Sequence, residues 1–277
     1  MVGKVDVVMW TKNGAAYLPA VLAQIDKVIP KDHVCHKIMV DDHSTDATPE
    51  IAQRFGWSVY PNPHGGIPSG ANEALSHVDQ EFFVSIEQDV ILAKDWWIKI
   101  SKHLEDPSVA CAQGIRVPTD PVLRLLDMWQ YGDPAKRASN ISMDNNLFRT
   151  AVVRSVGGFP NVCRVCTDTV LMKTIHAKTP YRWVIDLNVV SDHIRSDFRG
   201  AVEHQYKLND LCTKTKYCAP SQIGSLPKMF RILLTSPIRA LQIAVKKNCP
   251  KVLYAYPLIR YYQLTAEVRW RKHSFRN

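Results

Sequence analysis

The chain has 277 residues, of which 46% are hydrophobic and 22% are charged, and its formal net charge is +9. This composition is ordinary for a globular protein and allows one large domain, or a domain with an appendage. We expect no membrane-spanning helix, because no uninterrupted apolar run reaches the roughly 18 residues that a span needs.

The charge is unevenly distributed along the chain. Residues 1–194 hold 19 Lys and Arg against 22 Asp and Glu, whereas residues 195–277 hold 16 against 4. A near-neutral body is therefore followed by a basic region with a net charge of +12. Such asymmetry indicates an anionic partner, which is either a nucleic acid or a membrane surface.

The first hundred residues alternate between strand and helix patterns. The opening segment reads as a strand and not as a secretory signal, since its apolar run is short and interrupted by Asp6. Thr48 is the expected N-cap of the second helix, with Pro49 at its first position. We expect strands at 5–10, 36–42, 57–60 and 81–92, helices at 15–29, 47–55 and 95–106, and a Gly-rich loop entering a helix at 64–78.

The middle of the chain is less regular. Residues 142–160 predict a strand, a short helix and a Gly turn, and a helix is expected to open at Thr167 and Asp168. Residues 181–194 are strand-like and end at Asp192 and His193. Strands that alternate with helices indicate βαβ units and an α/β fold with a largely parallel sheet.

Polar residues cluster where the predicted strands end. Asp41, Asp42, Gly66, Glu87 and Asp89 all fall at or just after these ends. In open α/β sheets, ligands bind beyond the carboxyl ends of the strands. Carboxylates at this edge suit Mg²⁺ or Mn²⁺, which prefer oxygen ligands and often bridge to phosphates, and a ligand from His193 would favour Mn²⁺. The sequence contains neither a Gly-x-Gly-x-x-Gly motif nor a Walker loop, which argues against a dinucleotide enzyme.

Six segments in order resemble family 2 glycosyltransferases of the GT-A fold over most of residues 4–195. They are VVMWTKNGAAYL, VDDHSTDAT, GGIPSGANEAL, SIEQDVIL, DNNLFRTAVVRSVGGF and CTDTVL. The chain departs from the family pattern at four positions: Met9 replaces a Pro, Ala71 an Arg, Glu87 an Asp and Thr167 a Glu. The change at Ala71 leaves open which residue counters the diphosphate of a donor.

The resemblance implies a role for each matching residue. Asp168 would be the catalytic base, Asp89 the direct metal ligand, and Glu87 and His193 further metal contacts. Nucleotide-sugar binding would involve a larger set: Thr11, Asn13, Asp41, Asp42, Gly66, Asn72, Glu87, Gln88 and Asp89. The acceptor side would include Asn145, Asn146 and Gly158.

Some of these residues, and Asp46, also have an ordinary structural explanation, and Asp41 could equally pair with a Lys. Asp46 either caps a turn or binds a ligand, and Asp168 stands where an acid favours a helix start. His193 could be an ordinary polar residue, and Asn145 and Asn146 could simply turn the chain.

Residues 206–277 are expected to form a basic helical region that follows a catalytic domain of residues 1–205. Residues 211–277 hold 13 Lys and Arg and a single acid, Glu267, interleaved with apolar residues. Helices in a membrane interface explain this pattern best, packing on the catalytic domain is the second explanation, and nucleic-acid binding is the third. Pro237, Pro250 and Pro257 are expected to divide the region into short helices.

The cysteines carry no clear signal. Their number is seven, and Cys163 and Cys166 form a CxxC, while five residues separate Cys212 from Cys218. A zinc site is possible at poor spacing, but free thiols or one or two disulfides are the simpler interpretation.

The sequence therefore predicts an inverting, metal-dependent glycosyltransferase at the cytoplasmic face of the cell membrane, as a peripheral or monotopic protein. The resemblance favours GDP-mannose as donor, with a UDP-hexose second, and a lipid or lipid-linked acceptor. The alternatives are a UDP-hexose-dependent transferase acting on a soluble or polysaccharide acceptor, and a non-catalytic nucleotide-sugar or nucleic-acid binding protein.

Overall fold

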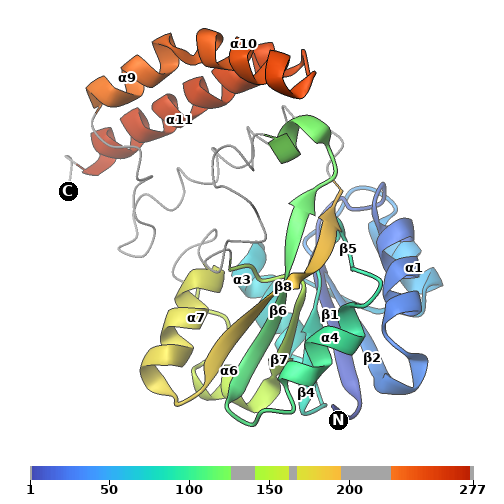
Figure 1. The fold of residues 1–277 in the computed structure, drawn as a ribbon. Coiled ribbons are helices and arrows are strands. Elements are labelled where there is room, and N and C mark those ends of the chain that lie inside the picture. Colours follow the sequence, from blue (N-terminus) through green and yellow to red (C-terminus); the bar gives the residue numbers. More distant parts are fainter. Residues whose placement is uncertain (1, 126–140, 162–166, 195–225, 275–277) are drawn as a thin grey trace. The chain divides into compact units, whose positions relative to one another are not determined.

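A computed structural model describes residues 2–125, 141–161, 167–194 and 226–274 (Figure 1). These residues fall into two compact units. The N-terminal unit holds the described residues up to Thr119 together with 141–161 and 167–194, and the C-terminal unit holds 120–125 and 226–274. The expected domain boundary after residue 205 lies outside the described residues and stays a prediction.

The N-terminal unit is built on one sheet with the strand order β3-β2-β1-β4-β7-β6-β8-β5. Its strands are β1 Val5–Thr11, β2 Val34–Asp41, β3 Ser58–Pro61, β4 Phe82–Ser85, β5 Val90–Ile91, β6 Val109–Pro118, β7 Asn146–Arg149 and β8 Arg182–His193. Strands β3, β2, β1 and β4 are parallel neighbours. Strand β7 runs antiparallel between β4 and β6, and β8 is parallel to β6. The predicted α/β fold is confirmed, with a mixed second half of the sheet.

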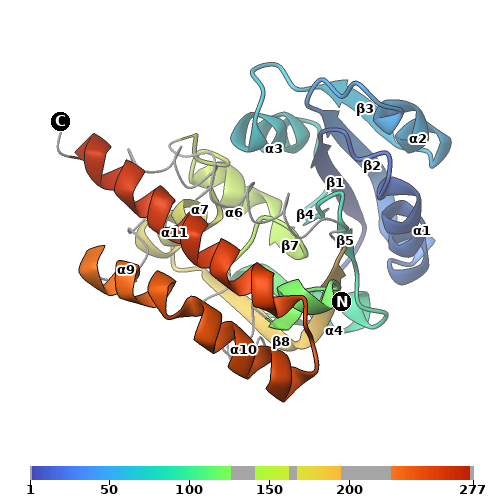
Figure 2. The same cartoon turned by 90° about the horizontal axis from the view of Figure 1, so that it is seen from above.

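Helices cover both faces of this sheet, as the view in Figure 2 shows. They are α1 Leu18–Val28, α2 Thr48–Arg54, α3 Ile67–Ser76, α4 Trp96–His103, α6 Thr150–Ser155 and α7 Thr167–Lys178, with a 3-10 turn η1 at Lys31–His33. Successive side chains of β1 point to opposite faces. Val7 and Met9 therefore pack with α1, α2 and α4, whereas Val8 and Trp10 pack with α3, α6 and α7.

The spacing of apolar residues predicted helix α1 correctly. Leu18, Val21, Leu22, Ile25 and Val28 are all buried, which is the periodicity of a helix with one face in the core.

Two local expectations were wrong, and one strand was missed. Residues 81–92 form two strands, because the chain turns at 86–89 and β5 leaves β4 to pair with β8. Helix α2 has Ala47 as its N-cap, since Thr48 is already helical and its hydroxyl oxygen accepts the backbone N–H of Gly14 at 2.7 Å. Strand β6 was not recognised from the sequence, although it is buried along most of its length.

The described part of the C-terminal unit is helical. It contains a helical stretch at 121–125, α9 Leu226–Leu234, α10 Ser236–Lys247 and α11 Val252–Ser274. Val122, Ala240, Ile243, Tyr256 and Ile259 belong to its core. Pro237 stands in the first turn of α10 as expected, but α11 continues through Pro257, so this proline does not end a helix. None of the helices in the described ranges is both long and apolar enough to cross a membrane.

Candidate active site

The sheet brings six chain segments to one edge. The carboxyl ends of β1, β2 and β4 meet there because these strands are parallel. The register places the start of β7 beside the end of β4, through Asn146 and Ser85, and β6 and β8 end at the same edge. The side chains that follow or precede these ends therefore converge from distant parts of the chain.

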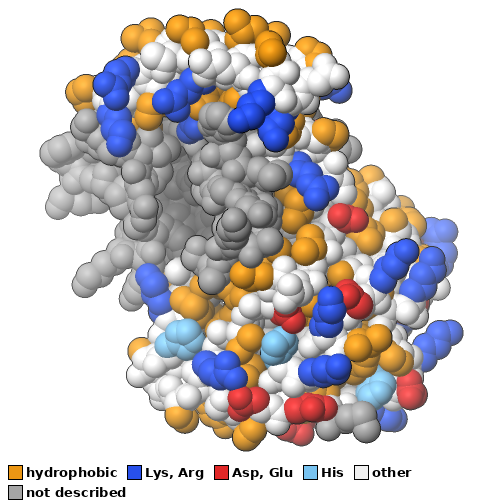
Figure 3. Space-filling model, viewed as in Figure 1, with side chains coloured by type: hydrophobic (Ala, Val, Ile, Leu, Met, Phe, Trp, Pro, Cys, Tyr) orange, Lys and Arg blue, Asp and Glu red, His pale blue; other side chains and the backbone are white. Residues whose placement is uncertain are grey.

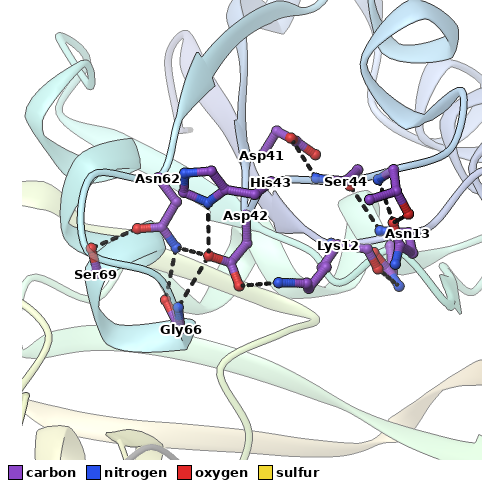
Figure 4. A network of polar contacts seen from close by, with 11 residues as sticks. Lys12, Asn13, Asp41, Asp42, His43, Ser44, Asn62, Gly66 and Ser69 are labelled. Atoms are coloured by element: carbon purple, nitrogen blue, oxygen red, sulfur yellow. Dashed lines mark hydrogen bonds and ion pairs between the residues drawn. The ribbon is translucent and has the colours of Figure 1, made fainter.

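One cluster follows the ends of β2 and β3 and is drawn in Figure 4. Asp42 lies at its centre, with Oδ1 accepting the side-chain amide of Asn62 at 3.0 Å and the backbone N–H of Gly66 at 3.2 Å. The ammonium group of Lys12 lies 3.5 Å from the other oxygen of Asp42. Gly66 has a φ of +80°, a conformation that suits glycine, and it precedes the first turn of α3. The hydrogen bond between Gly66 and Asp42 thus joins two residues that were predicted to bind the donor.

The loop after β1 is tied to the loop after β2. Asn13, with a φ of +50°, accepts the backbone N–H of Thr45 at 2.8 Å, and its own N–H donates to Ser44 Oγ at 2.8 Å. Asp41 accepts the N–H of Ser44 at 3.0 Å, and its second oxygen is buried with no hydrogen-bond partner. Asp46 accepts the N–H groups of Ala15 and Thr48. Asp46 therefore has a turn-forming function here.

Gln88 joins the loop after β4 to the end of β1. Its amide oxygen accepts from the Thr11 hydroxyl and from the backbone N–H of Lys12, the latter at 3.0 Å. Its amide nitrogen donates to the Lys12 carbonyl at 3.1 Å. These contacts hold the turn at 86–89 in place and so fix the two acids that flank Gln88.

Glu87, Asp89 and His193 form a possible cation site. One donor atom from each residue lies within 4.8 Å of the others, and His193 Nε2 is 3.0 Å from Asp89 Oδ2. The side chains of Asp89 and His193 are 14% and 10% exposed, so both are largely withdrawn from solvent. Two carboxylates and an imidazole fit Mn²⁺ well and also allow Mg²⁺ through the oxygens.

Two residues that the sequence did not single out complete this centre. Arg116, near the end of β6, places Nη1 at 2.7 Å from Glu87 Oε2 and at 2.8 Å from Asp144 Oδ2. Asp144 is fully buried, and its second oxygen has no hydrogen-bond partner. In the sequence Arg116 is a single charged residue in an apolar run, and Asp144 opens the segment DNNLFRTAVVRSVGGF without being assigned a role of its own.

The charges of this centre strongly affect one another. Burial raises the pKa of Asp144, and the Glu87 carboxylate raises it further, while Arg116 opposes both effects. Burial alone would lower the pKa of Arg116, but the carboxylates of Asp144, Glu87 and Asp89 raise it above its ordinary value. The centre thus holds more acids than bases, which favours the binding of a cation.

Asp168 lies in the first turn of α7, as expected. Burial raises its pKa from the ordinary 3.8 to about 6, and the Glu87 carboxylate adds to this, against hydrogen bonds from Thr169 and the charge of Arg116. The charges of Glu87 and Arg116 both act on Asp168, so its protonation is linked to that of the acidic cluster. A carboxyl with a pKa near neutrality is suited to accepting a proton.

Other predicted residues have structural contacts. Asn72 accepts the backbone N–H of Phe159 at 2.8 Å and donates to its carbonyl at 2.7 Å, next to Gly158. Asn145 is fully buried, donating to the Ile115 carbonyl at 3.0 Å and accepting from Ser191 Oγ at 3.0 Å.

Asn146 is also fully buried and donates to the Ser142 carbonyl at 2.7 Å. As placed, neither of these two asparagines reaches solvent, and their acceptor-side role stays a prediction. Cys163, Cys166, Cys212 and Cys218 lie outside the described residues, while Cys35, Cys111 and Cys249 are free thiols.

Comparison with solved structures supports the same fold. The mannosyltransferase PcManGT from Pyrobaculum calidifontis, in complex with GDP-Man and Mn²⁺, superposes with a TM-score of 0.68 at 20% identity, covering 96% of this chain and 86% of that one. TarS of S. aureus with UDP-GlcNAc gives 0.57 at 16% identity, with coverages of 98% and 92%.

A third solved structure is glucosyl-3-phosphoglycerate synthase from Mycobacterium tuberculosis with Mn²⁺ and UDP. It gives a TM-score of 0.57 at 15% identity and covers 80% of this chain and 82% of that one. No protein among the curated sequences matches this chain.

The fold and the acidic site define a nucleotide-sugar glycosyltransferase of the GT-A type. The profile of glycosyl transferase family 2 matches residues 6–155, more than half of the sequence. The chain belongs to this family and is an enzyme of the glycosyltransferase class.

Proposed function

We propose that the protein transfers a hexose, with inversion, from a nucleotide sugar to a hydroxyl group of a lipid or lipid-linked acceptor at a membrane surface. The observation that carries this proposal is the convergence of Asp89, Glu87 and His193 in one cluster, and Asp168, a buried carboxyl with a raised pKa on which the Glu87 charge acts, supports it. GDP-mannose is the first candidate donor, because PcManGT has this fold with GDP-Man and Mn²⁺, and a UDP-hexose is the second.

The residues of the site fit a divalent cation. Asp89 and Glu87 supply carboxylate oxygens, His193 supplies Nε2, and the local excess of acids lowers the cost of bringing a cation there. When bound, Mn²⁺ or Mg²⁺ would neutralise negative charge on the departing nucleoside diphosphate. Asp89 is the proposed direct ligand, because the Glu87 carboxylate already accepts a hydrogen bond from Arg116.

The remaining residues bind and activate the substrates. Asp42 and the loop at Asn13, which are joined to neighbouring loops by hydrogen bonds, are the proposed binding residues for the base and ribose of the donor. Asp168 accepts the proton of the acceptor hydroxyl while that oxygen bonds to the anomeric carbon and the bond from this carbon to the diphosphate oxygen breaks. A single displacement of this kind inverts the configuration at the anomeric carbon.

A membrane-bound acceptor is supported by an exposed apolar stripe on α9 and α10. The stripe consists of Phe230, Leu234, Ile238, Leu241 and Val245, which are 52–77% exposed and follow one another at intervals of three or four residues. This spacing places them on one helical face, opposite the buried residues of the same helices.

Basic side chains flank this stripe. They are all exposed and comprise Lys228, Arg231, Arg239, Lys246, Lys247 and Lys251. In Figure 3 apolar side chains line the upper rim of these helices, with a row of Lys and Arg beneath them. An apolar face bordered by cations is typical of helices that lie in the interface of an anionic bilayer.

Donor binding is tested by a thermal-shift panel of GDP- and UDP-sugars with and without Mn²⁺. The proposal expects stabilisation by one class of donor that depends on Mn²⁺, and release of nucleoside diphosphate by the wild type but not by Asp89→Ala. A non-catalytic binding protein, the alternative of another class, would be stabilised by the donor without releasing the diphosphate.

Membrane binding is tested by flotation with vesicles that contain anionic lipid. Leu234→Glu removes an apolar side chain whose burial in the membrane interface contributes about 2 kcal/mol. The partition constant for vesicle binding should therefore fall about 30-fold. Ile98→Glu is the matched control, because Ile98 is 61% exposed on α4 of the N-terminal unit. Equal flotation of the wild type, both variants and a truncation after residue 210 would exclude the membrane assignment.

A further inference from the structure

Glu87 is already engaged by a cation of the protein itself. Arg116 Nη1 lies 2.7 Å from Glu87 Oε2, which is hydrogen-bond distance for a charge-assisted pair. Both residues are partly exposed, with 27% and 23% of their side chains accessible. The carboxylate that would face a bound metal is therefore paired with a guanidinium in this state.

Asp144 holds Arg116 from the buried side. Its carboxylate is fully buried and 2.8 Å from the same Nη1, so it cannot itself contact a substrate at the surface of the site. Asp144 begins no helix and belongs to the turn before β7, so its burial is explained best by its pairing with Arg116. Without this partner, the buried carboxylate would cost several kcal/mol.

Position 71 supplies no positive charge to the site. Ala71 is a fully buried residue of α3, packed in the core with Ala74 and Leu75. Lys12 is the other nearby cation among the described loops, but it pairs with Asp42. Arg116 is thus the described cation that lies directly on the carboxylates of the metal-type cluster.

We propose that Arg116 is a binding residue for the donor diphosphate and that it exchanges partners. Without substrates it pairs with Glu87. When cation and donor bind, its guanidinium contacts a diphosphate oxygen, and the freed Glu87 carboxylate turns to the cation or to its water. Asp144 is the positioning residue that keeps Arg116 at the site throughout. The inference rests on the proposed function of the site.

If Arg116 exchanges partners in this way, Arg116→Gln should change the affinity for Mn²⁺ and the affinity for the nucleotide in opposite directions. Calorimetric titration of the protein with Mn²⁺ alone should give binding that is about tenfold tighter than in the wild type, because Glu87 is freed and a positive charge is lost. Titration of GDP and of UDP at saturating Mn²⁺ should give binding that is at least about tenfold weaker, because the diphosphate loses its guanidinium. A residue with only a structural role would weaken both or neither.

A second variant guards against misfolding. Arg116→Gln leaves Asp144 buried without a cation, whereas the double variant Arg116→Gln with Asp144→Asn keeps a neutral hydrogen-bonded pair at the same position. It should fold and show the same opposite changes. Arg182→Gln is the matched control, since it removes an Arg from an ion pair with Asp106 at the opposite end of β8. It should change neither titration.

The outcomes separate the two proposals. A wild type that binds neither Mn²⁺ nor either nucleotide would contradict the proposed function. A wild type that binds both, together with folded Arg116 variants in which the two affinities move in the same direction or stay unchanged, would overturn the partner exchange.

Discussion

Asp168 is expected to reduce the stability of the protein while it serves the reaction. Burial raises its pKa from 3.8 to about 6, so the ionised form is disfavoured in the folded protein. A rise of this size corresponds to about 3 kcal/mol, since each pH unit is worth about 1.4 kcal/mol. Asp168→Asn keeps an oxygen that can accept the N–H of Thr169 but removes the charge. The variant should therefore be more stable than the wild type at pH 7.5 by up to about 3 kcal/mol.

The sign follows from proton binding. Between the two pKa values the folded protein binds more protons at Asp168 than the unfolded chain does, so its stability increases as the pH falls from about 6 towards 4. The advantage of Asp168→Asn is complete above pH 6 and shrinks to about 1 kcal/mol at pH 4.5, where most of the carboxyl is protonated in the folded protein.

Denaturant unfolding of both proteins at pH 7.5 and 4.5 measures this difference, and activity assays accompany it. Loss of the base should reduce turnover by about 100-fold or more, and wild-type turnover should rise with pH through about 6 as Asp168 loses its proton. Asp106→Asn is the contrasting control, because hydrogen bonds from Ser108 and Arg182 lower the pKa of Asp106 to about 2 and its loss should not stabilise the protein. Asp168→Asn that is no more stable than the wild type at pH 7.5, or equally stabilised at both pH values, would refute the reasoning.

Three further substitutions test separate contacts, two of them at predicted site residues and one in the core of the N-terminal unit. Asp89→Asn should weaken Mn²⁺ binding by more than about 100-fold in a calorimetric titration, since even outer contacts of a metal site contribute about 10–100-fold. Gly158→Ala should lower the free energy of unfolding by about 2–3 kcal/mol, because φ of Gly158 is +77° and an added Cβ would lie 2.5 Å from Asn72 Oδ1. In the control Gly157→Ala the added Cβ meets no atom, so the loss of stability should be smaller. Asp6→Asn should cost about 2–3 kcal/mol in denaturant unfolding, because the buried carboxylate accepts backbone N–H groups on both oxygens and the amide turns one acceptor into a donor. Unchanged stability in either of the last two variants would contradict the contact on which it depends.

The sequence predicted those parts of the site that depend on strand ends. Parallel strands end at one edge, so the strand pattern alone was enough to group Asp42, Glu87 and Asp89. Helix α1 was equally accessible, because its apolar period of 3.6 residues is undisturbed. In both cases a local pattern along the chain was sufficient.

Arg116 and Asp144 could not be found in this way. Their pairing depends on β7 running antiparallel between β4 and β6, which brings residues 28 positions apart within 2.8 Å. The alternation of strands and helices indicated a largely parallel sheet, so β6 was overlooked together with its charge. The break of residues 81–92 into β4 and β5 had the same origin, because β5 is defined by its pairing with the distant β8.

The overall charge of +9 does not describe either of the two surfaces to which functions are proposed. At the edge of the sheet, Glu87, Asp89, Asp144 and Asp168 outnumber the single guanidinium of Arg116, and this local excess of acids explains why the site suits a cation that accompanies a diphosphate. The positive charge resides instead in residues 195–277, where the described basic side chains lie exposed beside an apolar stripe. The net charge of the whole chain, taken alone, would indicate a nucleic-acid partner for the protein. Separated by unit, the same residues form an acidic cluster at the sheet edge and a basic, apolar surface on α9 and α10, which is the combination expected for the proposed transferase with a membrane-bound acceptor.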